Sequence, residues 1–119
     1  MKALFVALLL SIATQKPTPK PPRVLTIRLH DVHVDARLAS GCRRTAGDAN
    51  MVGGTVQCDD TTEWRTLAIR NVNAYDIKLS DLRVRWGVSS NKWDVESNAR
   101  GFWKAKVAWY DANTIDVSR

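Results

Sequence analysis

The chain has 119 residues, which leaves room for one domain. It is 45% hydrophobic and 25% charged, a balance typical of a folded globular protein and not of a disordered one. The formal net charge of +6 favours anionic partners. The basic residues are nevertheless scattered along the chain without an RNA-binding signature, so nucleic acid is not expected as a partner.

The first 13 residues have the pattern of a secretory signal peptide. A basic start is followed by an apolar run over residues 3–12, which is too short to span a bilayer because a spanning helix needs about 20 residues. Small residues at Ser11 and Ala13 predict cleavage after Ala13, and an uncleaved anchor is the alternative. The protein is therefore expected to be secreted.

Residues 14–22 contain all four prolines of the chain. Proline fixes φ and lacks a backbone donor, so an extended, polyproline-like segment is expected here. We interpret it as a spacer, with a ligand for an aromatic groove of another protein as the alternative. A single folded domain is predicted over residues 23–119.

The domain begins with a strand-like alternation over residues 24–38. Apolar residues lie at every second position up to Leu29, and after Asp31 the apolar phase moves by one residue, to Val32. One inserted residue re-aims every side chain that follows it, so the shift predicts a β-bulge at Asp31. His30 and His33 point to opposite faces of a regular strand, which argues against a shared metal site.

Residues 39–60 are polar and rich in glycine, and they include both cysteines of the chain, Cys42 and Cys58. Two cysteines in a secreted domain predict one disulfide, with two unpaired thiols as the alternative if the chain is not secreted. Without a clustered histidine they are too few for a structural zinc site. Gly53-Gly54 is a turn signal, so we expect a long loop or a hairpin stapled at its base.

Residues 63–87 read as two strands joined by a polar turn. The first strand is predicted over residues 64–72, and turn chemistry follows at residues 71–74, where Asn tolerates left-handed backbone angles. The second strand alternates up to Leu79, and its apolar phase then shifts to Leu82. This shift predicts a second β-bulge, at Ser80-Asp81.

The remaining segments complete an all-β pattern. Residues 89–101 are interpreted as a polar connection, residues 102–110 as a strand with Trp103 and Trp109 in the core, and residues 114–117 as a short last strand. No sustained helical period occurs after the signal peptide. The sequence thus predicts a small antiparallel β-sandwich of about six to eight strands in two layers, stapled by one disulfide.

Residues 63–87 also resemble the first hairpin of the aegerolysins, small β-sandwich proteins that bind membrane lipids. The likeness lies in a Trp, an Ile-rich strand, an Asn-Val turn, Asp-Ile-Lys-Leu, Leu-Arg and a closing Trp-Gly, here Trp86-Gly87. A second likeness covers residues 86–95, with Asn-x-Trp-x-Val, and the strand over residues 103–110. The family's central strands have no counterpart in this chain, and its members are mostly acidic.

The resemblance implies a membrane lipid, of the sphingolipid class, as the ligand. Family members approach the membrane with aromatic residues at one end of the sandwich, and some recruit a partner with a membrane-attack-complex/perforin domain that makes a pore. The predicted lipid-binding residues combine rings suited to the membrane interface with basic groups that match phosphate, and they are Trp64, Trp86, Trp93, Arg83, Arg85 and Lys92.

No constellation of residues in the sequence predicts catalysis. No histidine beyond His30 and His33 exists to complete a triad, no serine lies in a nucleophile-elbow context, and no cofactor motif is present. The alternative to lipid binding is a secreted interaction protein that buries its tryptophans and binds a host protein through the loop between Cys42 and Cys58. An incomplete gene product is a third reading, because the family's central strands have no counterpart.

Overall fold

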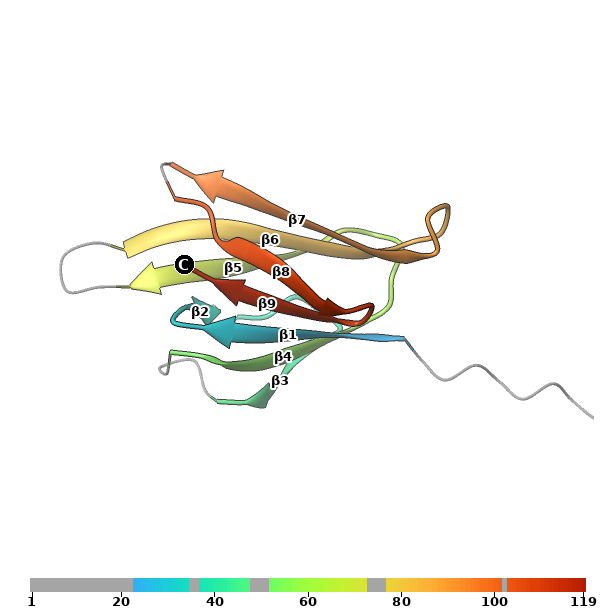
Figure 1. Ribbon diagram of the computed structural model, residues 1–119, viewed down its shortest axis with the longest axis horizontal. Coiled ribbons are helices and arrows are strands. Elements are labelled where there is room, and N and C mark those ends of the chain that lie inside the picture. The colour runs from blue at the N-terminus through green and yellow to red at the C-terminus, as the bar shows by residue number, and fades with distance from the viewer. Residues whose placement is uncertain (1–22, 35–36, 48–51, 73–76, 102) are drawn as a thin grey trace, which may run out of the picture.

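The computed structural model (Figure 1) describes residues 23–34, 37–47, 52–72, 77–101 and 103–119. The predicted signal peptide, residues 1–13, and the predicted spacer, residues 14–22, lie outside the described residues. The predicted turn at residues 71–74 is described only in part.

Most of the described residues form strands, and none of them forms a helix. The strands are β1 (Val24–His30), β2 (His33–Val34), β3 (Cys42–Ala46), β4 (Gly54–Asp59), β5 (Arg65–Val72), β6 (Ile77–Gly87), β7 (Lys92–Arg100), β8 (Lys106–Asp111) and β9 (Thr114–Ser118). Five of them make one sheet in the order β3-β4-β1-β9-β8, and four make a second sheet in the order β2-β5-β6-β7. The predicted all-β fold of two layers is confirmed.

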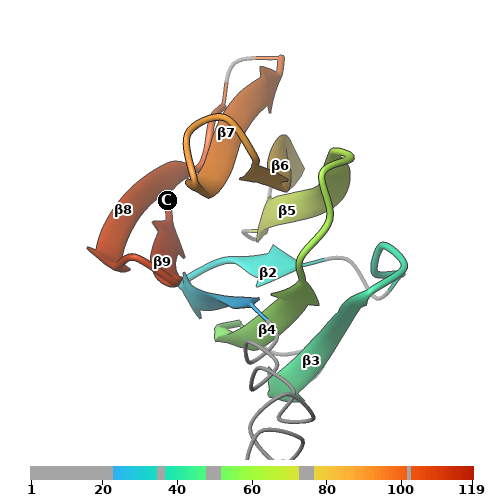
Figure 2. The same cartoon turned by 90° about the vertical axis from the view of Figure 1, so that its right-hand side faces the viewer.

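Neighbouring strands run antiparallel with one exception, the parallel pair β1 and β9. Figure 2 looks onto one end of the two layers, in which β7 and β8 are edge strands of the two sheets. The core lies between the layers and consists of aliphatic side chains at alternate strand positions, among them Leu25, Ile27, Val56, Leu67, Ile69, Leu82, Val84, Ile115 and Val117.

The predicted disulfide between Cys42 and Cys58 is present. The two residues lie directly opposite each other on β3 and β4, with their sulfur atoms 2.08 Å apart. Gly53 and Gly54, both with positive φ, precede or begin β4. The antiparallel pair of β3 and β4 therefore forms the stapled hairpin.

The phase shift at Asp31 arises from a change of sheet and not from a bulge. Asp31 has a φ of +57°, and the chain leaves the five-stranded sheet there. His33 and Val34 then pair with β5 in the other sheet. Val32 and Val34 are buried by this crossing, and the predicted bulge within one strand is wrong.

No bulge occurs at Ser80-Asp81 either, because β6 pairs with β5 and β7 in unbroken register through these residues. Ser80 is instead a buried polar residue in the inward phase of Leu82 and Val84. Its Oγ accepts a hydrogen bond from the backbone N–H of Ala105 at 3.1 Å and donates to the carbonyl of Asn98 at 3.1 Å. The apparent shift in the sequence arises because the apolar Leu79 takes the outward phase of the strand and the polar Ser80 the inward one.

The prediction of a polar connection over residues 89–101 is also wrong, because β7 occupies most of it. This strand is polar because it lies at the edge of the four-stranded sheet and pairs with β6 alone. Its inward positions carry Trp93 and Val95, and its outward positions carry Asp94 and Glu96. The next strand, β8, begins at Lys106, four residues later than the pattern predicted.

Candidate functional site

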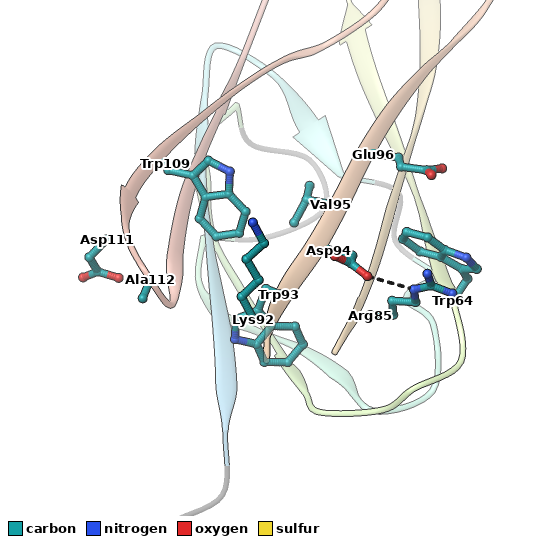
Figure 3. Close-up of a pocket in the computed structure, with 10 residues that line it drawn as sticks. All are labelled: Trp64, Arg85, Lys92, Trp93, Asp94, Val95, Glu96, Trp109, Asp111 and Ala112. Carbon is teal, nitrogen blue, oxygen red and sulfur yellow. Dashed lines mark hydrogen bonds and ion pairs between the residues drawn. The ribbon is translucent and has the colours of Figure 1, made fainter. Parts of the chain in front are cut away.

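A groove of about 760 Å³ opens between the edge strands β7 and β8 (Figure 3). It lies toward the end of the sandwich that carries the β6–β7 loop and the β8–β9 turn, on the right in Figure 1. Side chains from both layers line it, and they are Trp64, Arg85, Lys92, Trp93, Asp94, Val95, Glu96, Trp109, Asp111 and Ala112.

The indole ring of Trp109 is exposed to solvent in the groove. It lies opposite the buried residue Ile115 and therefore faces inward, but no described strand lies beyond β8 to cover it. Its exposed fraction is 50%, so the prediction that it fills the core is wrong. The Lys92 side chain extends from β7 toward this indole across the groove (Figure 3).

Trp93 closes the floor of the groove and is only 2% exposed. Its indole N–H donates a hydrogen bond to Oδ1 of Asn113 at 3.1 Å, and its ring meets Trp86 edge-on at 5.5 Å between centroids. The sequence predicted that Trp93 is exposed at a membrane interface. The burial of its ring contradicts this exposure. Trp86 is half-buried, and the guanidinium of Arg23 covers its ring at 4.2 Å.

Trp64 lies on the outer face of the four-stranded sheet, where two arginines cover its ring. The guanidinium carbons of Arg83 and Arg85 are 4.5 and 4.2 Å from the ring centroid. Arg83 pairs with Glu96 at 3.2 Å, and Arg85 pairs with Asp94 at 3.1 Å. Each pair joins residues directly opposite on β6 and β7. Both arginines thus meet carboxylates of this chain, and neither is held ready for phosphate.

Lysines supply the uncommitted positive charge around the groove. Lys92, Lys104 and Lys106 are all exposed, and in the described part of the chain none of them forms an ion pair. Asp111 receives a hydrogen bond from the backbone N–H of Asn113 at 2.8 Å, which shapes the β8–β9 turn. The groove therefore presents the ammonium group of Lys92 together with the open indole of Trp109, while Lys104 and Lys106 lie outside its lining.

The structure brings most of the predicted lipid-binding residues to one region. Four of them line the groove directly, Trp86 packs against Trp93, and Arg83 lies beside Trp64. Sequence reasoning misplaced Trp109 as well as Trp93. The alternation of Trp109 indicated an inward side chain, but only the strand order reveals that β8 is an edge with no described strand beyond it.

A second polar cluster lies on the outer face of the five-stranded sheet. Asp116 accepts two hydrogen bonds from Arg28, at 2.7 and 2.8 Å, and its Oδ1 is 2.8 Å from Nε2 of His30. These bonds lower the pKa of Asp116 to about 2. The guanidinium of Arg28 also lies 4.1 Å from the centre of the Tyr110 ring. The polar groups of this network bind one another, so we do not regard it as a binding site.

The described ranges lack two kinds of feature. No three or more His, Cys, Asp or Glu side chains gather there in a way that could hold a metal ion. No helix with the length and apolarity needed to cross a bilayer occurs among the same residues.

The groove combines an exposed aromatic ring, the ammonium group of Lys92 and two strand edges. Such a site can bind a ligand through apolar contact, charge and backbone hydrogen bonds. In comparisons with known proteins, no family model, no curated protein and no solved structure matches this chain.

Proposed function

We propose that this chain is a secreted, non-catalytic interaction domain that binds a partner protein in the groove between β7 and β8. The observation that carries the proposal is Trp109, which is half exposed in a groove between two edge strands. Concave sites that combine apolar surface with polar groups are typical binding sites, and tryptophan is enriched among the residues that dominate binding energy at protein interfaces.

The environment of the other tryptophans favours a protein partner over a membrane. A ring that inserts into a bilayer interface must expose its apolar surface. Trp93 is buried, and arginines cover the rings of Trp86 and Trp64. Those three rings are the ones expected to meet lipid; Trp93 and Trp86 pack in or against the core, and Trp64 lies outside it under two arginines.

The groove also has the mixed polarity of a protein-binding site. Apolar surface from Trp109 and Val95 lies between polar groups of β7 and the β8–β9 turn. Protein interfaces have this arrangement, with an apolar centre and a polar rim. By contrast, the stapled hairpin between Cys42 and Cys58 does not contribute to the lining of the groove. It is therefore not the binding surface that we favour.

The test uses a photo-crosslinking amino acid in place of Ala112, at the rim of the groove. The variant protein is exposed to extracellular proteins of candidate target cells, and crosslinked products are identified by mass spectrometry. Each captured protein is then produced in pure form, and its Kd for the uncrosslinked domain is measured by calorimetry. We expect Trp109→Ala to weaken binding about 30-fold or more, as for an aromatic anchor.

Val52→Ser is the matched control because Val52 is an exposed apolar residue on the β3–β4 connection, away from the groove. It should leave the Kd unchanged. Equal affinity of wild type and Trp109→Ala for a purified partner would show that the partner binds elsewhere, and the proposal would then be wrong.

Membrane lipid binding is the second candidate, and the β6–β7 loop is the observation that favours it. Val88 in this loop is 70% exposed, and Lys92 follows at the same end of the sandwich. The aegerolysin resemblance implies a sphingolipid as the ligand and a membrane-attack-complex/perforin partner for any pore. Co-sedimentation with vesicles, with and without sphingolipid, tests this candidate. Salt-resistant, sphingolipid-dependent binding that Val88→Asp abolishes would favour it over a protein partner.

A further inference from the structure

The outer edge of β8 has no neighbouring strand within the described part of the chain. β8 pairs only with β9, on its inner side, and it ends the five-stranded sheet. In Figure 2 this edge borders the opening between the two layers. An edge strand exposes a row of unpaired N–H and C=O groups, which can pair with a strand from another chain.

The two faces of β8 differ in chemistry. Val107 and Trp109 lie opposite the buried residues Val117 and Ile115 and so face the groove. Lys106 and Ala108 face the other way, on the outer surface of the sheet, and Lys104 is exposed two residues before Lys106. A strand added beside β8 would therefore meet apolar groups on one face and lysines on the other, at alternate positions.

The charged side chains around this edge determine whether an acidic or a basic strand would be favoured beside β8. Three carboxylates line the groove: Asp94 and Glu96 are paired with Arg85 and Arg83, and Asp111, beyond the bulge of β8, accepts a hydrogen bond from the backbone N–H of Asn113. Lys92, Lys104 and Lys106 form no ion pair in the described ranges. Lysines on an edge disfavour pairing with a basic strand, a second copy of this chain with its +6 charge included. An acidic strand would meet complementary charge.

The bulge in β8 limits the length of the added strand. The register of β8 against β9 shifts between Trp109 and Asp111, so Tyr110 is the inserted residue. Bulges bend and twist a strand and end regular pairing. The regular edge consequently runs from Lys106 to Trp109, enough for a short ladder with Trp109 at its end.

We propose that β8 accepts an extended, acidic segment of a partner protein as a sixth strand of this sheet. The segment alternates carboxylate and apolar side chains. The carboxylates lie over Lys104 and Lys106 on the outer face, and the apolar side chains pack on Val107 and Trp109 in the groove. This inference rests on the proposed function, because it specifies what occupies the same groove.

The test uses synthetic peptides of about eight residues that alternate glutamate with valine or lysine with valine. Calorimetry should show the acidic peptide binding at least about tenfold more tightly than the basic one. Lys106→Glu should weaken the acidic peptide by about tenfold, whereas Arg37→Glu, an equal charge change on the segment before β3, should not. N-methylation of alternate peptide amides on one edge should abolish binding, and N-methylation on the other edge should not.

Three results would overturn strand addition. They are no measurable binding of the acidic peptide, equal binding of the acidic and basic peptides, and insensitivity to N-methylation on both edges. If any of these occurred while a purified partner still depended on Trp109, the groove would remain the binding site and only the strand-addition mode would be wrong. Loss of the Trp109 dependence itself would instead remove the proposed function.

Discussion

The indole N–H of Trp93 donates a hydrogen bond to Oδ1 of Asn113, with 3.1 Å between the two atoms. Trp93 belongs to β7 in one layer, and Asn113 belongs to the β8–β9 turn of the other. The carbonyl of Asn113 also accepts a hydrogen bond from the N–H of Thr26 at 2.8 Å, at the start of β1. One asparagine therefore links the two edge strands of the groove to the centre of the five-stranded sheet.

Removing this link should loosen the groove without unfolding the domain. Asn113→Ala deletes the acceptor of a buried indole N–H, and we expect the free energy of unfolding to fall by about 1–3 kcal/mol. Trp93→Phe removes the donor from the same bond. The double variant should lose less stability than the sum of the two single losses, as urea denaturation can measure. Additive losses would show that the bond contributes nothing.

Ser80 provides a second test, at the hydroxyl that interrupts the apolar pattern of β6. Ser80→Ala should lower the free energy of unfolding by about 1–3 kcal/mol, because the N–H of Ala105 then lacks its acceptor. Ser89→Ala is the control, because Ser89 is exposed in the β6–β7 loop, and it should change stability by less than about 0.5 kcal/mol. Equal stability of Ser80→Ala and wild type would contradict this role.

These residues show why strand alternation predicted the fold class but missed local features. Alternation at Leu25, Ile27 and Leu29 identifies β1 correctly, because each apolar residue faces the core. At Ser80 the same rule fails, because a serine can occupy an inward position when its hydroxyl is satisfied. At Asp31 the rule detects a change but cannot tell a bulge from a crossing between sheets. That distinction depends on long-range pairing with β5.

The candidate site was predictable only in part, for a similar reason. Arg85 and Trp64, which the sequence predicted as lipid-binding residues, line the groove. Their contacts with Asp94 and with each other depend on strand register, which the sequence does not state. Trp93 and Trp109 exchange the roles expected of them. Both alternate inward, yet Trp93 is capped by the β8–β9 turn while Trp109 lies at an uncovered edge. Topology, and not local pattern, decides which ring is open.

Asp116 predicts how stability depends on acid. Its pKa is lowered from 3.8 to about 2 in the folded protein by hydrogen bonds from Arg28 and His30. A depressed carboxyl pKa contributes stability that is present above about pH 4 and is lost as the pH falls toward 2. The urea midpoint of the wild type should therefore fall over this range. In Asp116→Asn the fall should be smaller, and an identical acid profile would contradict the assignment.

The disulfide should account for a large share of the stability of so small a domain. Cys42 and Cys58 are 16 positions apart, and closing a loop of that size stabilises a fold by about 3 kcal/mol in the chain-entropy model. The double variant Cys42→Ser, Cys58→Ser should lose about that much or more, because the side chain of Cys58 is fully buried. Denaturant titration of oxidised wild type against the double variant measures the loss. A loss below about 1 kcal/mol would contradict this prediction.

The central claim is that partners bind between β7 and β8. It is tested most directly by hydrogen–deuterium exchange of the whole domain, with and without a saturating purified partner. We predict that exchange slows at residues 106–111 of β8 and at residues 92–96 of β7, which border the groove. Slowing confined to the β6–β7 loop at residues 88–91, or to the hairpin at residues 42–59, with β8 unchanged, would contradict the claim.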